Sequence, residues 1–324
     1  MIISNQAGIS LPGAKNDKGG MKKPAPELKA LKNFKGRLTG VMSQLDFPIS
    51  VYAATVRDQY RKPRPGMWKE VLEHYDLDDE KGVDQTGTFY VGDAAGRTAD
   101  GSSGNSDKDF ASSDRDFAAN AGIPFMTPEE FFLGHKPRPF KRSFDPGLYL
   151  DESKQPPPFA RSNNLDIVVF CGSPGAGKST YYWNVLAPLG YERVNQDILK
   201  SRDKCLKVAV EHLQAGRSVA VDNTNADSET RRHWLDLAKR FGIPARCVVF
   251  KADPKLCEHN ATVRALNATL NPESRDALPQ VAFVSFAKRF QQPTLKEGFD
   301  DITMVEFSFR GTPEQQAVWS QYHI

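Results

Sequence analysis

Hydrophobic positions in the second half of the chain follow two periods in turn, and these predict strands that alternate with helices. Residues 165–171 (LDIVVFC) form an apolar run rich in β-branched side chains, which is typical of a buried parallel strand. Helical spacing predicts two helices, each ended by a glycine, at 203–215 and 227–241. Shorter apolar strands are predicted at 191–194, 218–221, 246–250 and 302–307. This alternation predicts an α/β domain in which helices cover both faces of a parallel sheet.

A glycine-rich stretch follows the first of these strands. Its pattern, GxxxxGK[ST], is formed by Gly172, Ser173, Pro174, Gly175, Ala176, Gly177, Lys178, Ser179 and Thr180. After it the spacing is helical, with apolar positions at Trp183, Leu186 and Leu189. Glycines let the backbone approach phosphate groups, so that backbone N–H groups and the positive end of the helix point at them. The stretch therefore predicts a site for ATP, where Lys178 reaches the β- and γ-phosphates and the Ser179 hydroxyl ligates Mg²⁺.

Three charged residues are candidates for chemistry beside this loop, because ligands of such sheets bind where the strands end. Asp197 follows the strand at 191–194, and a carboxylate there can accept the proton of an attacking hydroxyl. Asp222 ends the strand at 218–221 and can hold Mg²⁺ or its waters. Arg264 can close over the triphosphate as a lid arginine. Acidic residues also cap helices and close turns, and arginines cover solvated helix faces, so structural roles stay open for all three.

The helix that carries Arg264 has its own start pattern. Asp253 is predicted as the N-cap and Pro254 as the first helical residue. Its apolar stripe is predicted to contain Leu256, Val263, Leu266 and Leu270.

Composition is that of a globular protein of about two domains, with 39% hydrophobic and 26% charged residues over 324 positions. No apolar run approaches the ~20 residues of a membrane span, and no secretion signal is predicted. The net charge of +3 permits a polyanionic partner. Without CxxC spacing, the cysteines are predicted to be reduced, buried thiols of an intracellular protein, with a zinc or disulfide role as the alternative; they are Cys171, Cys205, Cys247 and Cys257.

Two segments have a biased composition. Between Lys15 and Arg37 the chain holds eight basic residues against two acidic ones, which indicates either a solvated helix face or loop, or a surface for nucleic-acid phosphates. Residues 135–164 are rich in proline, including Pro156 to Pro158, and are predicted to be a semi-rigid linker. The linker separates a predicted N-terminal domain, 1–134, from the P-loop domain, 165–324.

The N-terminal domain carries a second, incomplete pattern for phosphate chemistry. Ser4 and Asn5 follow the start of an apolar strand, Lys62 lies in an Arg-Lys-Pro run, and Asp93 follows the predicted strand TFYV. Asp114 comes later in the chain. A hydroxyl and an amide that hold a phosphate, a lysine that neutralises it and acids that bind Mg²⁺ would form a phosphate-monoester site. The pattern has no nucleophile.

Longer strings of residues are more specific than either pattern. In chain order they are SNQAGI, YRKPRPGMW, VGDAAGR, DRDFAANAGIPFMTPEEFF, GSPGAGKST, VNQD, VDNTNAD and QQPTLKEGF. In order and spacing, over nearly the whole chain, they resemble the polynucleotide kinase 3′-phosphatase family. The resemblance implies a haloacid-dehalogenase-like (HAD-like) Rossmannoid 3′-phosphatase domain followed by a P-loop 5′-hydroxyl kinase domain with a parallel sheet.

What the resemblance implies about function is equally specific. It implies repair of DNA ends in the nucleus, on 5′-hydroxyl and 3′-phosphate ends, by a monomer that uses ATP and Mg²⁺ and works with DNA repair proteins. Asp197 matches the residue that activates the 5′-hydroxyl, and Lys62 matches the phosphatase lysine. Asp93 and Asp114 match the acids of its metal motif. Two rival functions stay open, a small-molecule P-loop kinase and a non-catalytic module that binds DNA ends.

The sequence departs from the family pattern in two places. The family's phosphatase opens with an Asp-x-Asp-Gly-Thr motif before SNQ, and its first aspartate takes the phosphoryl group; this sequence lacks it. We therefore expect an incomplete first domain, loss of the covalent phosphatase reaction, and weakened folding of residues 1–130. Turnover that Asp93→Asn abolishes would contradict this. In the lid, Thr262 and Arg264 stand where animal members carry two arginines, so only Arg264 transfers. The other Asp-x-Asp triplets, predicted to be solvated charge, begin at Asp76, Asp107 and Asp114.

Overall fold

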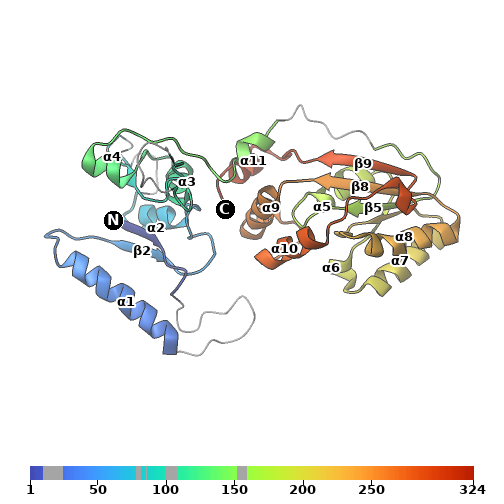
Figure 1. Ribbon diagram of the computed structural model, residues 1–324, viewed down its shortest axis with the longest axis horizontal. Helices are drawn as coiled ribbons and strands as arrows, with labels where there is room; N and C mark the ends of the chain where they lie inside the picture. Colours follow the sequence, from blue (N-terminus) through green and yellow to red (C-terminus); the bar gives the residue numbers. More distant parts are fainter. Residues whose placement is uncertain (10–24, 78–81, 85, 100–107, 152–158) are drawn as a thin grey trace. The chain divides into compact units, whose positions relative to one another are not determined.

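The computed structural model describes residues 1–9, 25–77, 82–84, 86–99, 108–151 and 159–324, and it divides them into two compact units (Figure 1). Unit 1 comprises Met1–Asp145 and Gln321–Ile324, and unit 2 comprises Pro146–Ser320. In the part of the chain that is described, no helix is long and apolar enough to cross a membrane. Parts of the basic run, of the Asp-x-Asp triplets and of the proline-rich segment lie outside the described ranges, namely Lys15, Lys18, Lys22, Lys23, Asp78, Asp107 and Pro156 to Pro158.

A five-stranded parallel sheet forms the centre of unit 2 (Figure 1). Its strand order is β6-β7-β5-β8-β9, so that the strand before the glycine-rich loop is central. The strands are β5 (Ile167–Cys171), β6 (Glu192–Val194), β7 (Val219–Val221), β8 (Ala245–Lys251) and β9 (Asp301–Glu306). Each coincides with a predicted strand to within two residues at either end. The predicted parallel sheet is therefore confirmed.

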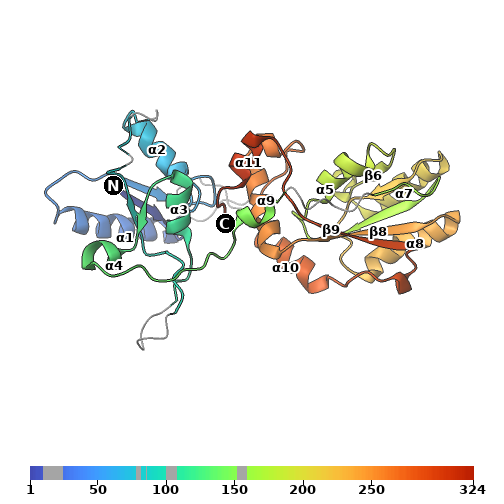
Figure 2. The same ribbon diagram turned by 90° about the horizontal axis from the view of Figure 1, so that it is seen from above.

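Helices cover both faces of this sheet, and alternate residues of β5 show why. Ile167 and Val169 face a core formed with α7 and α8, whereas Val168 and Phe170 face a second core formed with α5, α9 and α10. The view in Figure 2 shows these helices flanking the strands. The helices are α5 (Lys178–Tyr181), α6 (Gln196–Leu199), α7 (Arg202–Gln214), α8 (Ser228–Phe241), α9 (Pro254–Leu266), α10 (Gln280–Arg289) and α11 (Pro313–Trp319).

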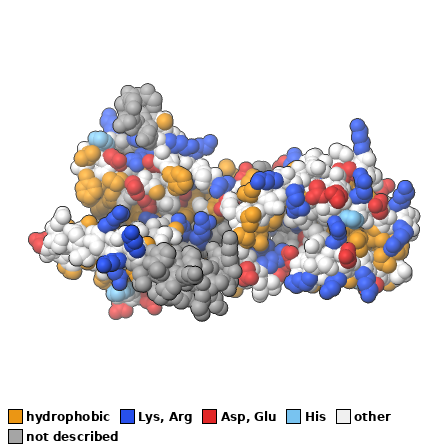
Figure 3. Space-filling view, turned by 60° about the horizontal axis from the view of Figure 1, so that its bottom comes forward, with side chains coloured by type: hydrophobic (Ala, Val, Ile, Leu, Met, Phe, Trp, Pro, Cys, Tyr) orange, Lys and Arg blue, Asp and Glu red, His pale blue; other side chains and the backbone are white. Residues whose placement is uncertain are grey.

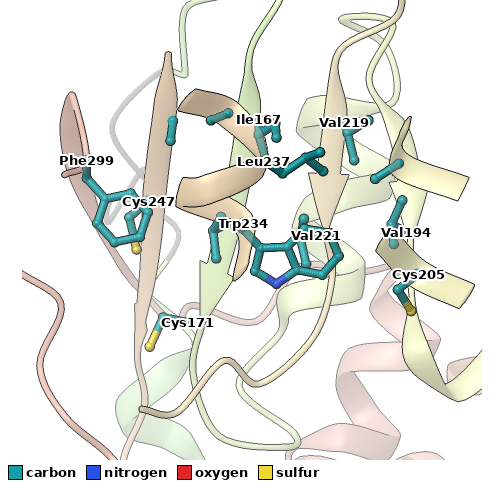
Figure 4. Close-up of a cluster of buried hydrophobic side chains, with 14 of the residues drawn as sticks. Ile167, Cys171, Val194, Cys205, Val219, Val221, Trp234, Leu237, Cys247 and Phe299 are labelled. Atoms are coloured by element: carbon teal, nitrogen blue, oxygen red, sulfur yellow. The ribbon is translucent and has the colours of Figure 1, made fainter. Parts of the chain in front are cut away.

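The first of these cores is centred on an indole ring from α8. Trp234 and Leu237 lie against Ile167, Val219 and Val221 of the sheet, as Figure 4 shows. All of these side chains are at most 5% exposed. At about 25 cal/mol per Å² of apolar surface removed from water, such burial fixes the sheet and hence the loops at its strand ends.

Short helical turns also occur, and two of them correct the sequence predictions. A π-helical turn (Tyr182–Leu186) continues α5, and it leaves the Trp183 side chain 52% exposed. Trp183 is therefore not part of the predicted apolar stripe. The helix α9 ends at Leu266, and Leu270 lies in a separate 3₁₀ turn (Ala268–Leu270), so the stripe predicted there is also shorter. Further 3₁₀ turns are Pro146–Tyr149 and Leu295–Glu297.

The predicted start of α9 is confirmed. The Asp253 side chain accepts a hydrogen bond from the backbone N–H of Lys255 at 2.8 Å, and Pro254 is the first helical residue. The four cysteines are free and buried, as predicted.

Unit 1 contains two pairs of parallel strands in separate sheets. They are β1 (Ile2–Asn5) with β2 (Val51–Ala54), and β3 (Tyr90–Val91) with β4 (Phe125–Met126). Its helices are α1 (Ala25–Met42), α2 (Gly66–His74), α3 (Ser113–Ala121) and α4 (Pro128–Leu133). A small core joins the strand pairs to α2 and α3, through Ile3, Met67, Val71 and Phe117. The described part of unit 1 is thus mixed α/β.

Part of the predicted linker belongs to unit 1. Lys141 donates its backbone N–H to the Gly96 carbonyl at 2.9 Å, and Phe144 is buried. The last residues of the chain also join this unit, because Asn120 exchanges two hydrogen bonds with the backbone of Tyr322, of 2.7 and 2.8 Å. The domain boundaries expected from the sequence stay a prediction.

The described part of the basic run lies on α1. Lys29, Lys32, Lys35 and Arg37 are exposed. On the face drawn in Figure 3, Lys and Arg side chains are spread over both units and mixed with acidic ones. Charge alone therefore singles out no nucleic-acid surface on that face, and both interpretations of the basic run remain open.

Candidate active sites

The glycine-rich loop joins the end of β5 to α5, and its glycines are required by geometry. Gly175 has a φ of +79° and Gly177 a φ of +91°, conformations that other residues rarely adopt. A Cβ atom on Gly175 would also clash with the backbone carbonyl oxygen of Cys257 in α9. The loop is thus closely packed on α9, and this packing allows only glycine at Gly175.

Lys178 projects back into this loop. Its Nζ donates hydrogen bonds to the carbonyl oxygens of Gly172 and Ser173, at 2.9 and 2.6 Å. The residue is 8% exposed, and burial lowers the pKa of its ammonium group. A buried ammonium group forms stronger hydrogen bonds with anionic oxygens than with the two neutral carbonyl oxygens that Lys178 contacts here. The loop therefore fits the phosphates of a nucleoside triphosphate, as the sequence predicted.

Asp197 lies in the first turn of the short helix α6. The side chain of Asn195 caps that turn by accepting from the backbone N–H groups of Asp197 and Ile198, at 2.9 and 3.3 Å. Asn195 in turn donates to the carbonyl oxygen of Asp222 at 2.7 Å, which ties α6 to the end of β7. The Asp197 side chain itself is 74% exposed, so its carboxylate is accessible to a substrate from solution.

Asp222, at the end of β7, is engaged by an arginine that the sequence analysis did not identify. Its Oδ2 accepts from the Nε and NH2 atoms of Arg193, at 2.8 and 2.5 Å, and the Asp222 side chain is 1% exposed. Within the described ranges, no three His, Cys, Asp or Glu side chains cluster as a metal centre. Mg²⁺ in kinases is commonly held by one or two side chains and phosphate oxygens. Ser179 and Asp222 therefore stay predictions as its ligands.

Two further residues missed from the sequence, Glu273 and Arg275, come from the segment between α9 and α10. Glu273 accepts from Arg193 NH1 at 2.6 Å and from the indole Nε1 of Trp183 at 3.0 Å. Burial alone would raise the pKa of Glu273, but these hydrogen bonds and the nearby arginines outweigh it and lower the pKa to about 2. Arg275 lies next to Glu273 and bonds to it through Nε at 2.8 Å.

Arg264, in the last turn of α9, is not a freely solvated helix residue. Burial lowers the pKa of its guanidinium group, and the positive charge of Arg275 lowers it further. Its Nε is buried with no hydrogen-bond partner among the residues that the structure describes. Asp197 and Glu273 also influence it electrostatically. The structure thus brings together Arg264, Arg275, Glu273 and Asp197.

In unit 1, Lys62 is the centre of the second candidate site. Its Nζ lies 2.6 Å from Asp114 Oδ1 and donates to the Ile3 carbonyl oxygen at 2.9 Å. Asn5 holds the lysine's backbone from both sides, because its Oδ1 accepts from the Lys62 N–H at 2.9 Å and its Nδ2 donates to the Lys62 carbonyl at 3.0 Å. The Ser4 hydroxyl accepts from the Gln6 amide at 2.8 Å.

Asp114 and Asp93 lie at the end of β3. Asp114 is 4% exposed, and its Oδ2 accepts from the Ala94 N–H at 3.0 Å. A Cβ atom on Gly92 would come within 2.6 Å of the Asp114 Cβ, so a glycine is needed for this close approach. Asp93 itself is exposed. The structure therefore places a lysine in direct contact with a buried acid of α3, and a second, exposed acid, Asp93, lies on the loop after β3 that Asp114 contacts.

The triplet that begins at Asp114 was predicted to be solvated charge, and this is wrong. Asp116 is 3% exposed, and its carboxylate accepts from Arg142 Nε at 2.6 Å. Burial raises the pKa of Asp116. Asp76, in contrast, is exposed, as predicted. Tyr90, which no sequence pattern indicated, also belongs to this site, because its hydroxyl accepts from Lys62 Nζ at 2.8 Å.

Comparison with known proteins finds a different family match in each half of the chain. The family described as "Polynucleotide kinase 3 phosphatase" matches residues 1–132, and one described as "AAA domain" matches residues 167–293. A bifunctional polynucleotide phosphatase/kinase of Schizosaccharomyces pombe is 39% identical over 327 residues, which cover 100% of this chain and 71% of that protein. The chain belongs to the bifunctional polynucleotide phosphatase/kinase family.

A second member of this family is also similar over the whole chain. A putative bifunctional polynucleotide phosphatase/kinase of Acanthamoeba polyphaga mimivirus is 32% identical over 342 residues, which cover 99% of this chain and 78% of that protein. The resemblance found from the residue strings is therefore confirmed, and so is the α/β fold with a P-loop unit.

Proposed function

We propose that this member of the bifunctional polynucleotide phosphatase/kinase family processes polynucleotide ends, and that unit 2 transfers the γ-phosphoryl group of ATP to a 5′-hydroxyl. One observation carries the proposal: an exposed carboxylate, Asp197, stands beside a P-loop whose lysine is buried in the loop. The two are linked through Arg275, which lies 3.3 Å from the Asp197 carboxylate and 3.2 Å from the hydroxyl oxygen of Ser179.

The reaction assigns each group a task. Asp197 accepts the proton of the 5′-hydroxyl while the 5′-oxygen forms a bond to the γ-phosphorus. The bond between that phosphorus and the oxygen bridging to the β-phosphate breaks, and ADP leaves. Lys178 and Arg264 stabilise the negative charge on the transferred group. Mg²⁺, when bound, neutralises the phosphate oxygens, and Ser179 and Asp222 are the residues that would hold it.

The exposure of Asp197 supports a polynucleotide acceptor over a small molecule. Sites for small substrates bury about 70–90% of the ligand surface, and their reacting groups are enclosed. A base that is 74% exposed can instead meet the end of a chain too large to be enclosed. This distinguishes the proposal from the rival small-molecule kinase.

For unit 1, we propose that Lys62, Ser4 and Asn5 bind the phosphate of a 3′-phosphate end, and that Asp93 and Asp114 hold a metal ion. The contact between Lys62 and Asp114 supports this, because a phosphate could share the lysine with the carboxylate. Nuclear location and DNA repair proteins as partners are further parts of the proposal, and they rest on the family.

The test uses one gapped duplex with a 5′-hydroxyl and a 3′-phosphate, incubated with ATP labelled at the γ-phosphate. Label should appear on the 5′ end, and Lys178→Ala should abolish the transfer. The control is Lys239→Ala, because Lys239 is an exposed lysine on α8. Transfer to metabolites alone would favour the small-molecule kinase, and duplex binding with no transfer would favour the non-catalytic module. Release of inorganic phosphate from the 3′ end measures the phosphatase reaction separately.

A further inference from the structure

Arg275 belongs to no motif of the sequence analysis, yet its guanidinium group contacts both halves of the kinase site. NH1 lies 3.3 Å from Asp197 Oδ2, on the acceptor side. NH2 donates to Ser179 Oγ at 3.2 Å, on the donor side. The Arg275 side chain is 25% exposed, whereas that of Asp197 is 74% exposed. Arg275 thus spans the space through which a phosphoryl group would pass from donor to acceptor.

We propose that Arg275 is a second arginine of the kinase centre, which holds Asp197 in place and contacts the phosphoryl group during its transfer. The proposal rests on the kinase function of unit 2 given above. The guanidinium group suits this role because it is planar and presents several N–H donors in a fixed fork. One arm can stay on the carboxylate while the other exchanges the Ser179 hydroxyl for a phosphoryl oxygen, which leaves that hydroxyl free to bind Mg²⁺.

Arg275 is held in this position by hydrogen bonds to its own backbone and by ion pairs that lead to the sheet. Asn271 forms two hydrogen bonds with the backbone of Arg275, of 2.8 and 2.9 Å. Glu273 bonds to the Arg275 guanidinium and also to Arg193, and Arg193 is paired with the buried Asp222 at the end of β7. This chain of ion pairs connects Arg275 to the strand ends of the sheet. Such support is what a group needs if it is to act on charge that develops during a reaction.

Arg264 supplies an independent observation that points to an anion at this place. Its buried Nε has no hydrogen-bond partner in the described part of the chain. Its guanidinium group is also close enough to Arg275 for the repulsion between them to lower its pKa, after the larger effect of burial. An anion between two arginines removes that repulsion and supplies the missing acceptor. The triphosphate that the P-loop binds is such an anion.

The test compares Arg275→Ala and Arg275→Lys with Arg289→Ala. Arg289 is a matched control because it is an arginine of α10, 54% exposed, which pairs only weakly with Asp227 at 3.4 Å. Each protein is assayed for kcat and KM for ATP and for a 5′-hydroxyl oligonucleotide, for ATP affinity by titration, and for Tm. We expect Arg275→Ala to lower kcat by about 10²–10³-fold with a small change in ATP affinity.

A conservative variant separates this role from a merely structural one. Arg275→Lys keeps the charge but loses the fork, so its kcat should lie between those of the wild type and Arg275→Ala.

A kcat of Arg275→Ala equal to that of Arg289→Ala would overturn the proposal. So would a kcat loss matched by an equal fall in the fraction of folded protein, with Arg275→Lys fully active. If the wild-type chain transfers no label to the oligonucleotide, the proposed kinase function fails as well, which the wild-type assay shows before any variant is compared.

Discussion

Replacing Asp197 by Asn gives the sharpest test of the proposed base, because the structure predicts a large effect on the reaction and a small one on the fold. The substitution keeps the size of the side chain and removes its charge. The carboxylate is 74% exposed and pairs with Arg275 at 3.3 Å. Exposed ion pairs contribute about 0–1 kcal/mol to stability, so the free energy of unfolding should change by no more than that. The cap on α6 should persist, because it uses the backbone N–H of residue 197.

The effect on the reaction is expected to be much larger. A positioned general base contributes about 10²–10⁴-fold to a rate. At about 1.36 kcal/mol for each factor of ten, the variant should raise the activation barrier by about 2.7–5.4 kcal/mol. ATP affinity should stay near that of the wild type, since Lys178 and the loop glycines that meet the phosphates are unchanged.

The assay is a single-turnover transfer of labelled γ-phosphate to a 5′-hydroxyl oligonucleotide, with ATP affinity and Tm measured in parallel. The matched control is Asp203→Asn, because Asp203 is likewise an exposed acid in the first turn of a helix, α7. A rate constant for Asp197→Asn within a few fold of that control would refute the assignment of Asp197 as the base. A fall in ATP affinity that accounts for the whole loss would refute it too.

Three further predictions follow from single contacts. Gly175→Ala should lower Tm and ATP affinity together, because the backbone φ at this position is +79°. An alanine at positive φ costs about 1–2 kcal/mol, and its Cβ would in addition clash with the backbone of Cys257. Thermal unfolding with and without ATP tests this. The pKa of Glu273 is about 2 in the folded chain, below its ordinary value of 4.5, so its contribution to stability is present above pH 4.5 and is lost as pH falls toward 2. Urea unfolding of Glu273→Gln should therefore depend less on pH in that window, and an unchanged slope would contradict this. Lys62→Ala leaves a buried Asp114 charge unpaired and should cost unit 1 about 3–5 kcal/mol. Urea unfolding should show that the double variant with Asp114→Asn recovers part of the loss.

Much of unit 2 could be predicted from the sequence because its local patterns coincide with its tertiary contacts. The strand β5 is apolar at every position, and all five of its residues are buried. Asp253 and Pro254 begin α9 through contacts with residues only a few positions away. The burial of Lys178 could be predicted from the glycine-rich loop, because this loop surrounds the side chain. For α9 and for Lys178 the interactions lie within one turn or loop, and for β5 the apolar pattern by itself indicates burial.

The contacts that the sequence analysis missed join residues far apart in the chain. Arg275 and Ser179 are separated by 96 positions, and Glu273 and Trp183 by 90. The segment around Arg275 is polar and has no helical or strand period, so no local pattern indicates that it folds over the P-loop. The spacing of Trp183 likewise predicts that it belongs to the apolar stripe. Its indole N–H instead donates to Glu273, and no pattern near Trp183 in the sequence indicates that contact.

The position of Asp222 could be predicted from the sequence, but its partner could not. An acid at the end of a parallel strand marks a position close to ligands, and this part of the prediction depends only on topology. Its partner depends on register: β6 runs parallel to β7 with Arg193 opposite Ala220, two residues before Asp222. A carboxylate that is 1% exposed must be neutralised, and here a neighbouring strand supplies the cation. A Mg²⁺ ion held at Asp222 would thus share this carboxylate with Arg193. Because Glu273 bonds to both Arg193 and Arg275, a shift of Arg193 would be passed on to Arg275. Asp222 is therefore the anchor of Arg193 and, through Arg193 and Glu273, of Arg275, which contacts Ser179 and Asp197.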